Sequence, residues 1–166
     1  ALLEKALRAL MAERDVPSDW EILVVDDGSG DRTREVVGSL QAESPVPVRY
    51  LFQENRGPAA ARNLGIRNAA GAIILFLGDD IIACPGLLEA HLECHRQHPD
   101  PAVAVLGHVA WSPAVEITPF MRWFERSGEQ FAFAALAGLE EVDPGAYFYT
   151  SNLSLKKAFL EQTGDP

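Results

Sequence analysis

The sequence predicts an α/β fold in which a mostly parallel sheet is flanked by helices on both faces. Short runs rich in β-branched residues alternate with helix-like segments of about ten residues, which indicates strand–helix–strand units with right-handed crossovers. A length of 166 residues is enough for one domain with a buried core. The chain starts in a helix-like stretch and stops without a closing element, so we expect a single domain, 1–166, that is incomplete at both ends.

The first third of the chain contains a predicted helix, strand and helix in that order. The leucines and alanines of residues 2–10 fall on one helical face, which is typical of an amphipathic helix. The run 21–25 is too short for a helix and indicates a buried strand. Asp31 is expected to cap the helix that follows, and Pro45 ends that helix.

The same alternation continues to about residue 110 and then loosens. Turn residues, prolines and Gly71 mark the ends of the segments. The elements expected here are strands at 48–52, 73–77 and 103–109 and helices at 58–70 and 87–97. Beyond Trp111 we expect one weak helix, Pro119–Ser127, and otherwise irregular or short strand structure.

Charge and cysteine content limit the classes of partner. The net charge of −10 repels nucleic acids and anionic lipid surfaces, and no basic patch is visible. Cys84 and Cys94 lack a C-x-x-C spacing and are expected to be reduced thiols. No apolar run reaches the length of a membrane span and no signal peptide is visible, so we expect a cytoplasmic protein; attachment to the inner face of a membrane would need segments outside this chain.

Two acidic clusters follow predicted strands directly. Asp26-Asp27 ends the first strand and Asp79-Asp80 follows the third, and the carboxyl ends of parallel strands lie at the edge of a sheet where ligands collect. Adjacent carboxylates repel each other, and a divalent cation with substrate phosphates would compensate them. The alternative is that both clusters are loops and helix caps, for which Asp, Gly and Ser are also the usual residues.

The segments "EILVVDDGSGDRT" and "NRGPAAARNLGIRNAAGAIILFLGDDI" together resemble the nucleotide-sugar half of a family 2 glycosyltransferase of the GT-A fold. The resemblance implies a nucleotide-sugar-binding half at 1–110 and the start of an acceptor-binding half at 111–166. It further implies transfer of a sugar from a nucleoside-diphosphate donor, most often a UDP-sugar, to a saccharide, lipid or protein acceptor. The expected reaction is inverting and depends on Mn²⁺ or Mg²⁺.

The resemblance also implies roles for individual residues. Asp26 would accept a hydrogen bond from the nucleotide base, with Asp27 supporting the loop beside it. Asp79 would bind the ribose, and Asp80 would ligate the cation that bridges the diphosphate. Arg62 would reach the base or the phosphates, although an arginine on a solvent-exposed helix face is the equal alternative.

The sequence departs from the family pattern at three places. Gly78 occupies the first position of the usual three-residue acidic motif, so metal binding rests on Asp80. The first strand of the family is absent before Ala1, and the acidic pair that supplies the catalytic base is expected beyond Pro166. We therefore name no catalytic base, and we expect these 166 residues to bind a nucleotide without turnover.

Three histidines and the later polar residues have simpler interpretations. His91, His95 and His98 lie at helical spacing, and a solvated helix surface is favoured over a metal site. Asn152 either contacts a sugar or holds a turn, and the sequence does not separate the two.

An aromatic cluster follows in the loosely patterned part of the chain. For Phe120, Trp123 and Phe124, packing in the core or against another domain is favoured over an acceptor pocket. The alternative functions are a sugar nucleotidyltransferase, which would carry a glycine-rich phosphate loop, and a non-catalytic nucleotide- or carbohydrate-binding relic.

Overall fold

The computed structural model describes residues 2–14, 16 and 19–162 and confirms the α/β class. Its helices and strands lie close to the expected ranges through residue 106. The elements in chain order are α1 Leu2–Met11, β1 Ile22–Asp26, α2 Thr33–Glu43, β2 Val48–Phe52, α3 Pro58–Asn68, β3 Ile73–Leu77, α4 Leu87–Gln97, β4 Ala104–Leu106, α5 Pro119–Ser127, α6 Phe133–Leu136, α7 Pro144–Tyr147, β5 Asn152–Lys156 and α8 Lys157–Gln162.

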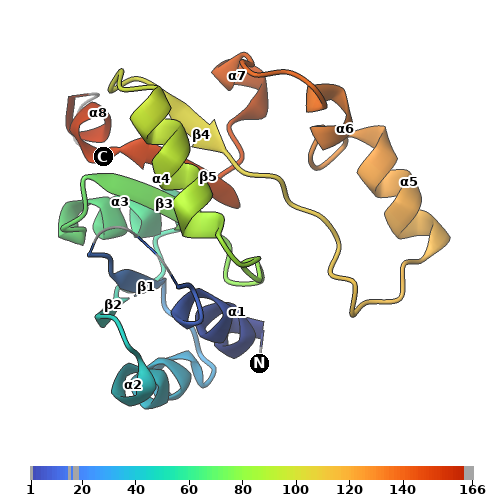
Figure 1. The fold of residues 1–166 in the computed structure, drawn as a ribbon. Helices are drawn as coiled ribbons and strands as arrows, with labels where there is room; N and C mark the ends of the chain where they lie inside the picture. Colours follow the sequence, from blue (N-terminus) through green and yellow to red (C-terminus); the bar gives the residue numbers. More distant parts are fainter. Residues whose placement is uncertain (1, 15, 17–18, 163–166) are drawn as a thin grey trace.

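The first half of the chain is a parallel pair of strands covered by helices. β1 pairs in parallel with β2, from Ile22 opposite Val48 to Asp26 opposite Phe52. α2 connects the two strands and packs on them together with α1, while α3 packs against β1 (Figure 1). The buried core of this half consists of Leu7, Met11, Ile22, Val37, Leu40 and Val48.

The second sheet contains a strand whose position the sequence did not indicate, although short strand structure was among the expectations beyond Trp111. β5 lies between β3 and β4 and runs antiparallel to both. β3 and β4 therefore run in the same direction, as expected for strands joined by α4. Leu153 and Leu155 of β5 are buried on one face of the strand, and Asn152 and Ser154 are buried on the other. Buried polar side chains at alternate positions obscure the hydrophobic run by which a central strand is normally detected.

The segment between β4 and β5 extends away from the two sheets. Figure 1 shows a long connection after β4 that leads to α5 and α6, which lie apart from the sheets. Phe120 and Trp123 of α5 are 66% and 57% exposed; both stack on Phe124, and their rings are tilted relative to each other. The expectation of core packing for these aromatics is wrong, whereas their packing against another domain stays a prediction. None of the helices within the described ranges has the length and apolarity needed to cross a bilayer.

Candidate functional site

The loop after β1 is built around the buried carboxylate of Asp26. This residue is 5% exposed, and its two oxygens accept hydrogen bonds from the Ser29 N–H at 2.7 Å and the Tyr50 hydroxyl at 2.5 Å. Burial raises the pKa of Asp26, but these hydrogen bonds outweigh it, and the net pKa lies below its ordinary value. Asp26 is thus held ionised at the end of β1. Each oxygen retains a second lone pair, although solvent reaches little of it.

The Asp27 carboxylate binds the turn that precedes α3. Its Oδ1 accepts hydrogen bonds from Gln53 Nε2 at 2.6 Å and from the Arg56 N–H at 2.8 Å, and its Oδ2 accepts from the Gly57 N–H at 2.8 Å. The amide of Gln53 and these backbone groups lower the pKa of Asp27. A negative charge beside the N-terminus of a helix is also favoured by the helix dipole. Asp27 therefore supports the loop, as predicted, by tying the end of β1 to α3.

The glycine in this loop is required by geometry. Gly28 has a φ of 85°, a left-handed conformation that side chains rarely adopt. A Cβ on Gly28 would lie 2.9 Å from the Asn55 backbone nitrogen, so the loop and the turn before α3 are in close contact. Asp31 Oδ1 accepts from the Thr33 N–H at 3.0 Å and the Thr33 hydroxyl at 2.6 Å, so it binds the first residue of α2, although the N-cap position itself is occupied by Arg32.

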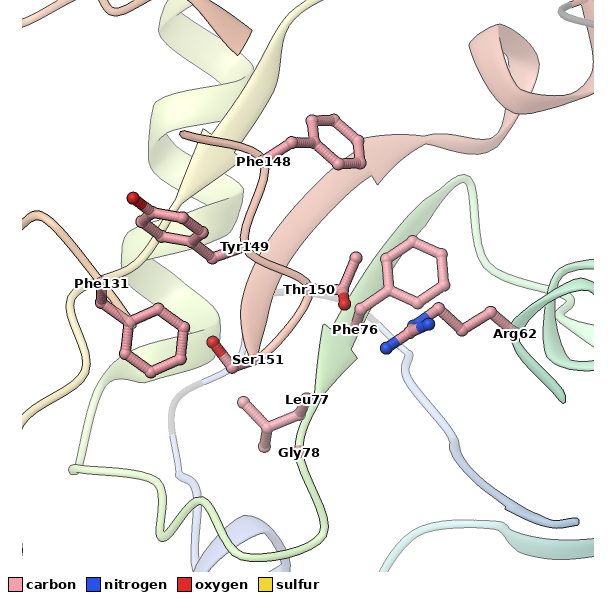
Figure 2. Close-up of a pocket in the computed structure, with 9 residues that line it drawn as sticks. All are labelled: Arg62, Phe76, Leu77, Gly78, Phe131, Phe148, Tyr149, Thr150 and Ser151. Atoms are coloured by element: carbon pink, nitrogen blue, oxygen red, sulfur yellow. The ribbon is translucent and has the colours of Figure 1, made fainter. Parts of the chain in front are cut away.

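A pocket of about 450 Å³ lies at the end of β3 (Figure 2). Arg62 comes from α3, five residues after Gly57 in the turn that Asp27 holds, and shares the pocket with Gly78, the residue before Asp79-Asp80. The wall is aromatic and the floor is the segment before β5. The residues that line the pocket are Arg62, Phe76, Leu77, Gly78, Phe131, Phe148, Tyr149, Thr150 and Ser151.

Ser151 is an unusual member of this pocket. Within the part of the chain that the structure describes, its Oγ is the buried side-chain polar atom without a hydrogen-bond partner. A buried hydroxyl without a partner costs free energy, and a polar ligand atom would recover it. Figure 2 shows the hydroxyl on the side of the floor that faces Phe131 and Tyr149.

Asp79 and Asp80 extend from the pocket into solvent. Both residues are exposed, and neither carboxylate forms a hydrogen bond or ion pair with another described residue. The Asp80 side chain folds back over Gly78, because a Cβ built on that glycine would lie 2.8 Å from Asp80 Oδ1. The bulk of an acidic side chain at position 78 would therefore crowd Asp80.

The oxygen atoms at this turn suit a hard cation whose coordination is completed by substrate. Among the described residues no group of three or more His, Cys, Asp or Glu side chains converges on one point. Two exposed carboxylates with open surroundings nevertheless match Mg²⁺ or Mn²⁺, which commonly use one or two carboxylates together with phosphate and water oxygens. The residues present fit such an ion as an open site.

One interpretation from the sequence, that of the histidines, needs correction, and for Asn152 the structure favours one of the two open alternatives. His91 and His95 are 5% and 3% exposed and face β5, so they do not form a solvated surface; only His98 does. Asn152 is 3% exposed and its side chain bonds to His91 and to the His108 carbonyl oxygen, so it holds the structure and is not available to a sugar.

Sequence reasoning also missed the two side chains that complete the loop after β1. Tyr50 and Gln53 come from β2 and the turn after it, about 25 residues from the carboxylates they bind. The signal that would have found them is register, since Asp26 lies opposite Phe52 when β1 and β2 pair in parallel.

The architecture, with acidic loops at the ends of β1 and β3 and an open pocket between α3 and β5, is that of a GT-A type domain. The family model described as "Glycosyl transferase family 2" matches residues 1–152. The chain belongs to this family.

Three relatives illustrate the match. Validoxylamine A glucosyltransferase of Streptomyces hygroscopicus subsp. limoneus is 33% identical over 186 aligned residues, which cover 99% of this chain and 40% of that protein. An uncharacterized glycosyltransferase of Nostoc sp. is 34% identical over 107 residues, 64% of this chain and 32% of its own length. Glycosyltransferase AglE of Haloferax volcanii is 36% identical over 78 residues, 47% of this chain and 26% of its own length. The chain thus spans well under half the length of these relatives.

Proposed function

We propose that the protein transfers a sugar from a nucleoside-diphosphate donor, a UDP-sugar in the first place, to a saccharide, lipid or protein acceptor, in an inverting reaction that uses Mn²⁺ or Mg²⁺. The observation that carries the proposal is the pocket itself. It is lined both by the cationic side chain of Arg62 and by Gly78, the residue that precedes the exposed carboxylates of Asp79 and Asp80. A family 2 membership narrows the chemistry of such a site to glycosyl transfer.

An anionic donor needs compensation in a chain of net charge −10. In our proposal Arg62 meets the phosphates or the base, Asp79 binds the ribose, and Asp80 holds the cation. When bound, the cation supplies Lewis-acid stabilisation of the charge that develops on the departing nucleoside diphosphate. Arg62 and the cation together would offset the repulsion between the donor and the acidic edge.

The loop after β1 would form the base end of the site. Asp27 holds Gly57 and the start of α3 in place, and it thereby helps to fix the backbone position of Arg62 on that helix. Asp26 is ionised and still has acceptor capacity, which suits a hydrogen bond from an N–H group of the base. In this proposal, Tyr50 and Ser29 act on the nucleotide only through Asp26.

The far side of the pocket suits a sugar. Aromatic rings present flat faces on which the C–H surface of a sugar packs. Phe131, Phe148 and Tyr149 supply such rings, and the Ser151 hydroxyl supplies an unsatisfied polar atom among them. We place the transferred sugar or the acceptor here.

The proposed location of the protein is the cytoplasm. The free thiols of Cys84 and Cys94 suit such a reducing compartment.

The test is calorimetric titration of UDP into the protein with and without Mn²⁺. We expect Mn²⁺ to tighten UDP binding, and we expect Asp80→Asn to weaken the Mn²⁺-dependent component at least about tenfold. Glu89→Gln on α4 is the matched control, because it removes one exposed negative charge away from the pocket. Binding of UDP that is indifferent to Mn²⁺ and to Asp80→Asn would support the non-catalytic binding alternative instead.

A further inference from the structure

A continuous line of polar side chains is buried between α4 and β5. His91 and His95 are one turn apart on α4 and face Asn152 and Ser154, which share one face of β5. The Ser154 Oγ lies 2.8 Å from His91 Nδ1 and 2.8 Å from His95 Nε2. His91 Nε2 lies 3.0 Å from Asn152 Oδ1.

The line continues at both ends into charged and backbone groups. Lys156 Nζ lies 3.3 Å from His95 Nδ1 and also donates to the carbonyl oxygens of His98 and Asp100, both at 2.8 Å. At the other end Asn152 Nδ2 donates to the carbonyl oxygen of His108, just after β4, at 3.4 Å. Lys156 is the charged side chain that contacts the line directly. The residues after α4 face Lys156 with two backbone carbonyl oxygens, those of His98 and Asp100.

The donors and acceptors fit together in one direction only. Lys156 is a donor without acceptor capacity, so His95 Nδ1 must accept and His95 Nε2 must carry the proton. Ser154 then accepts from His95 and donates its own hydrogen to His91 Nδ1. His91 Nε2 consequently carries the proton and donates to Asn152 Oδ1. Both histidines are therefore neutral, with the proton on Nε2.

The end of this line coincides with the floor of the pocket. Asn152 follows Ser151 directly, and the carbonyl oxygen of Ser151 accepts a hydrogen bond from the Gly78 N–H at 3.1 Å. The carbonyl oxygen of Asn152 accepts from the Gly107 N–H at 2.9 Å. A shift of Asn152 would move Ser151 and, through it, the residue that precedes Asp79.

We infer that His91 and His95 are positioning residues: their one-directional hydrogen-bond line fixes Asn152 and thereby holds Ser151 and Gly78 in place at the floor of the pocket. The inference rests on the proposed function only for the identity of the ligand that this floor receives. Neither histidine touches that ligand. Their role is to keep a polar strand in register where a purely apolar strand would be free to slip.

The first test reads the tautomers directly. In the protein labelled with ¹⁵N at histidine, we expect the two-bond correlation pattern of a neutral Nε2–H ring for both His91 and His95 at pH 7. Assignment comes from the His91→Gln and His95→Gln variants. A proton on Nδ1 of either ring, or a charged ring at pH 7, would overturn the inference. This result does not depend on whether the protein binds a nucleotide.

The second test separates positioning from general stability. His91→Phe keeps the ring volume and removes both nitrogens, and we expect the amide hydrogen of Gly78 to exchange at least about tenfold faster while amides of β1 and β2 are unchanged. His91→Gln keeps a donor for Asn152 and should recover part of this protection. His98→Phe, at the exposed residue directly after α4, is the control and should change nothing, because only the backbone carbonyl of His98 contacts Lys156.

Nucleotide affinity completes the design. We expect His91→Phe to weaken UDP binding and His91→Gln to restore part of it. Unchanged Gly78 exchange in His91→Phe, or equal acceleration at all amides, would show that the line does not position the floor. If the unmodified protein binds no UDP, the proposed function fails while the exchange and tautomer measurements still decide this inference.

Discussion

Gly107 offers a sharp test of how the polar side chains are packed. Its backbone does not have a positive φ, so alanine is allowed there by conformation. The space above it is already filled: a Cβ at position 107 would lie 2.2 Å from Asn152 Nδ2, 2.5 Å from Asn152 Cγ and 2.7 Å from Asn152 Oδ1. In Gly107→Ala the amide of Asn152 must therefore leave its site.

The cost follows from what that amide does. Moving it strains a packed region, which typically costs about 1–3 kcal/mol. It also breaks the hydrogen bonds to His91 and to the His108 carbonyl oxygen, each contributing roughly 1 kcal/mol. We expect Gly107→Ala to lower the free energy of unfolding by about 2–4 kcal/mol, because the two contributions overlap in part. Urea unfolding followed by circular dichroism measures the loss as a lower midpoint at constant slope.

Gly38→Ala is the matched control, since it makes the same substitution where nothing opposes it. Gly38 lies in the interior of α2 and is exposed, and apart from its chain neighbours and the backbone of its own helix no atom lies within 4 Å of the position that a Cβ would take. Alanine should stabilise the protein there by about 0.5–1 kcal/mol through helix propensity. If Gly107→Ala were neutral, or stabilised as Gly38→Ala does, Asn152 would not occupy the place described and the reasoning would be refuted.

Three further changes test other parts of the structure. Glu13 accepts hydrogen bonds from the backbone N–H groups of Gly86 and Leu88 at the start of α4, at 3.2 and 3.3 Å. Glu13→Ala should therefore lower the free energy of unfolding in urea by about 1–2 kcal/mol, and Glu13→Gln should recover part of it. Equal losses of stability in both variants would contradict a capping role. Tyr50→Phe removes the hydroxyl that donates to Asp26, so the pKa of Asp26 should rise in an NMR titration, and an unchanged pKa would count against the contact. Burial, Lys156 and His91 lower the pKa of His95 from 6.5 to about 4. The unfolded chain therefore takes up this proton first, and stability should be full above pH 6.5 and fall by up to about 3 kcal/mol as the pH drops toward 4. Between pH 7 and pH 5 about 2 kcal/mol of this loss should appear in urea unfolding. It should shrink in His95→Gln, and an undiminished loss in that variant would exclude His95 as its source.

Local signals were sufficient for most of the elements. Pro58 at the first turn of α3 predicted where that helix starts, and the apolar run 73–77 predicted β3 residue by residue. The acidic pairs were also found where expected, at the carboxyl ends of β1 and β3. These features depend on neighbours in the sequence, whose influence on the backbone is short in range.

Contacts between distant segments had no such signal. The spacing of His91 and His95 places them on one helix face, and their polarity favoured exposure of that face. They are core residues because Asn152 and Ser154, about 60 residues away, form hydrogen bonds with their ring nitrogens. β5 escaped prediction for the same reason, since its polar positions are tolerable in a core only when those partners are present.

The sequence by itself determined the class of fold, the order of its elements through β4 and the positions of the acidic turns, because backbone preferences and hydrophobic periodicity are local. The tertiary structure alone decided which side chains complete the site. Only folding brings Tyr50 to Asp26, Arg62 to Gly78 and the histidines to β5, because a hydrogen bond depends on the distance between atoms in space, not on their separation along the chain.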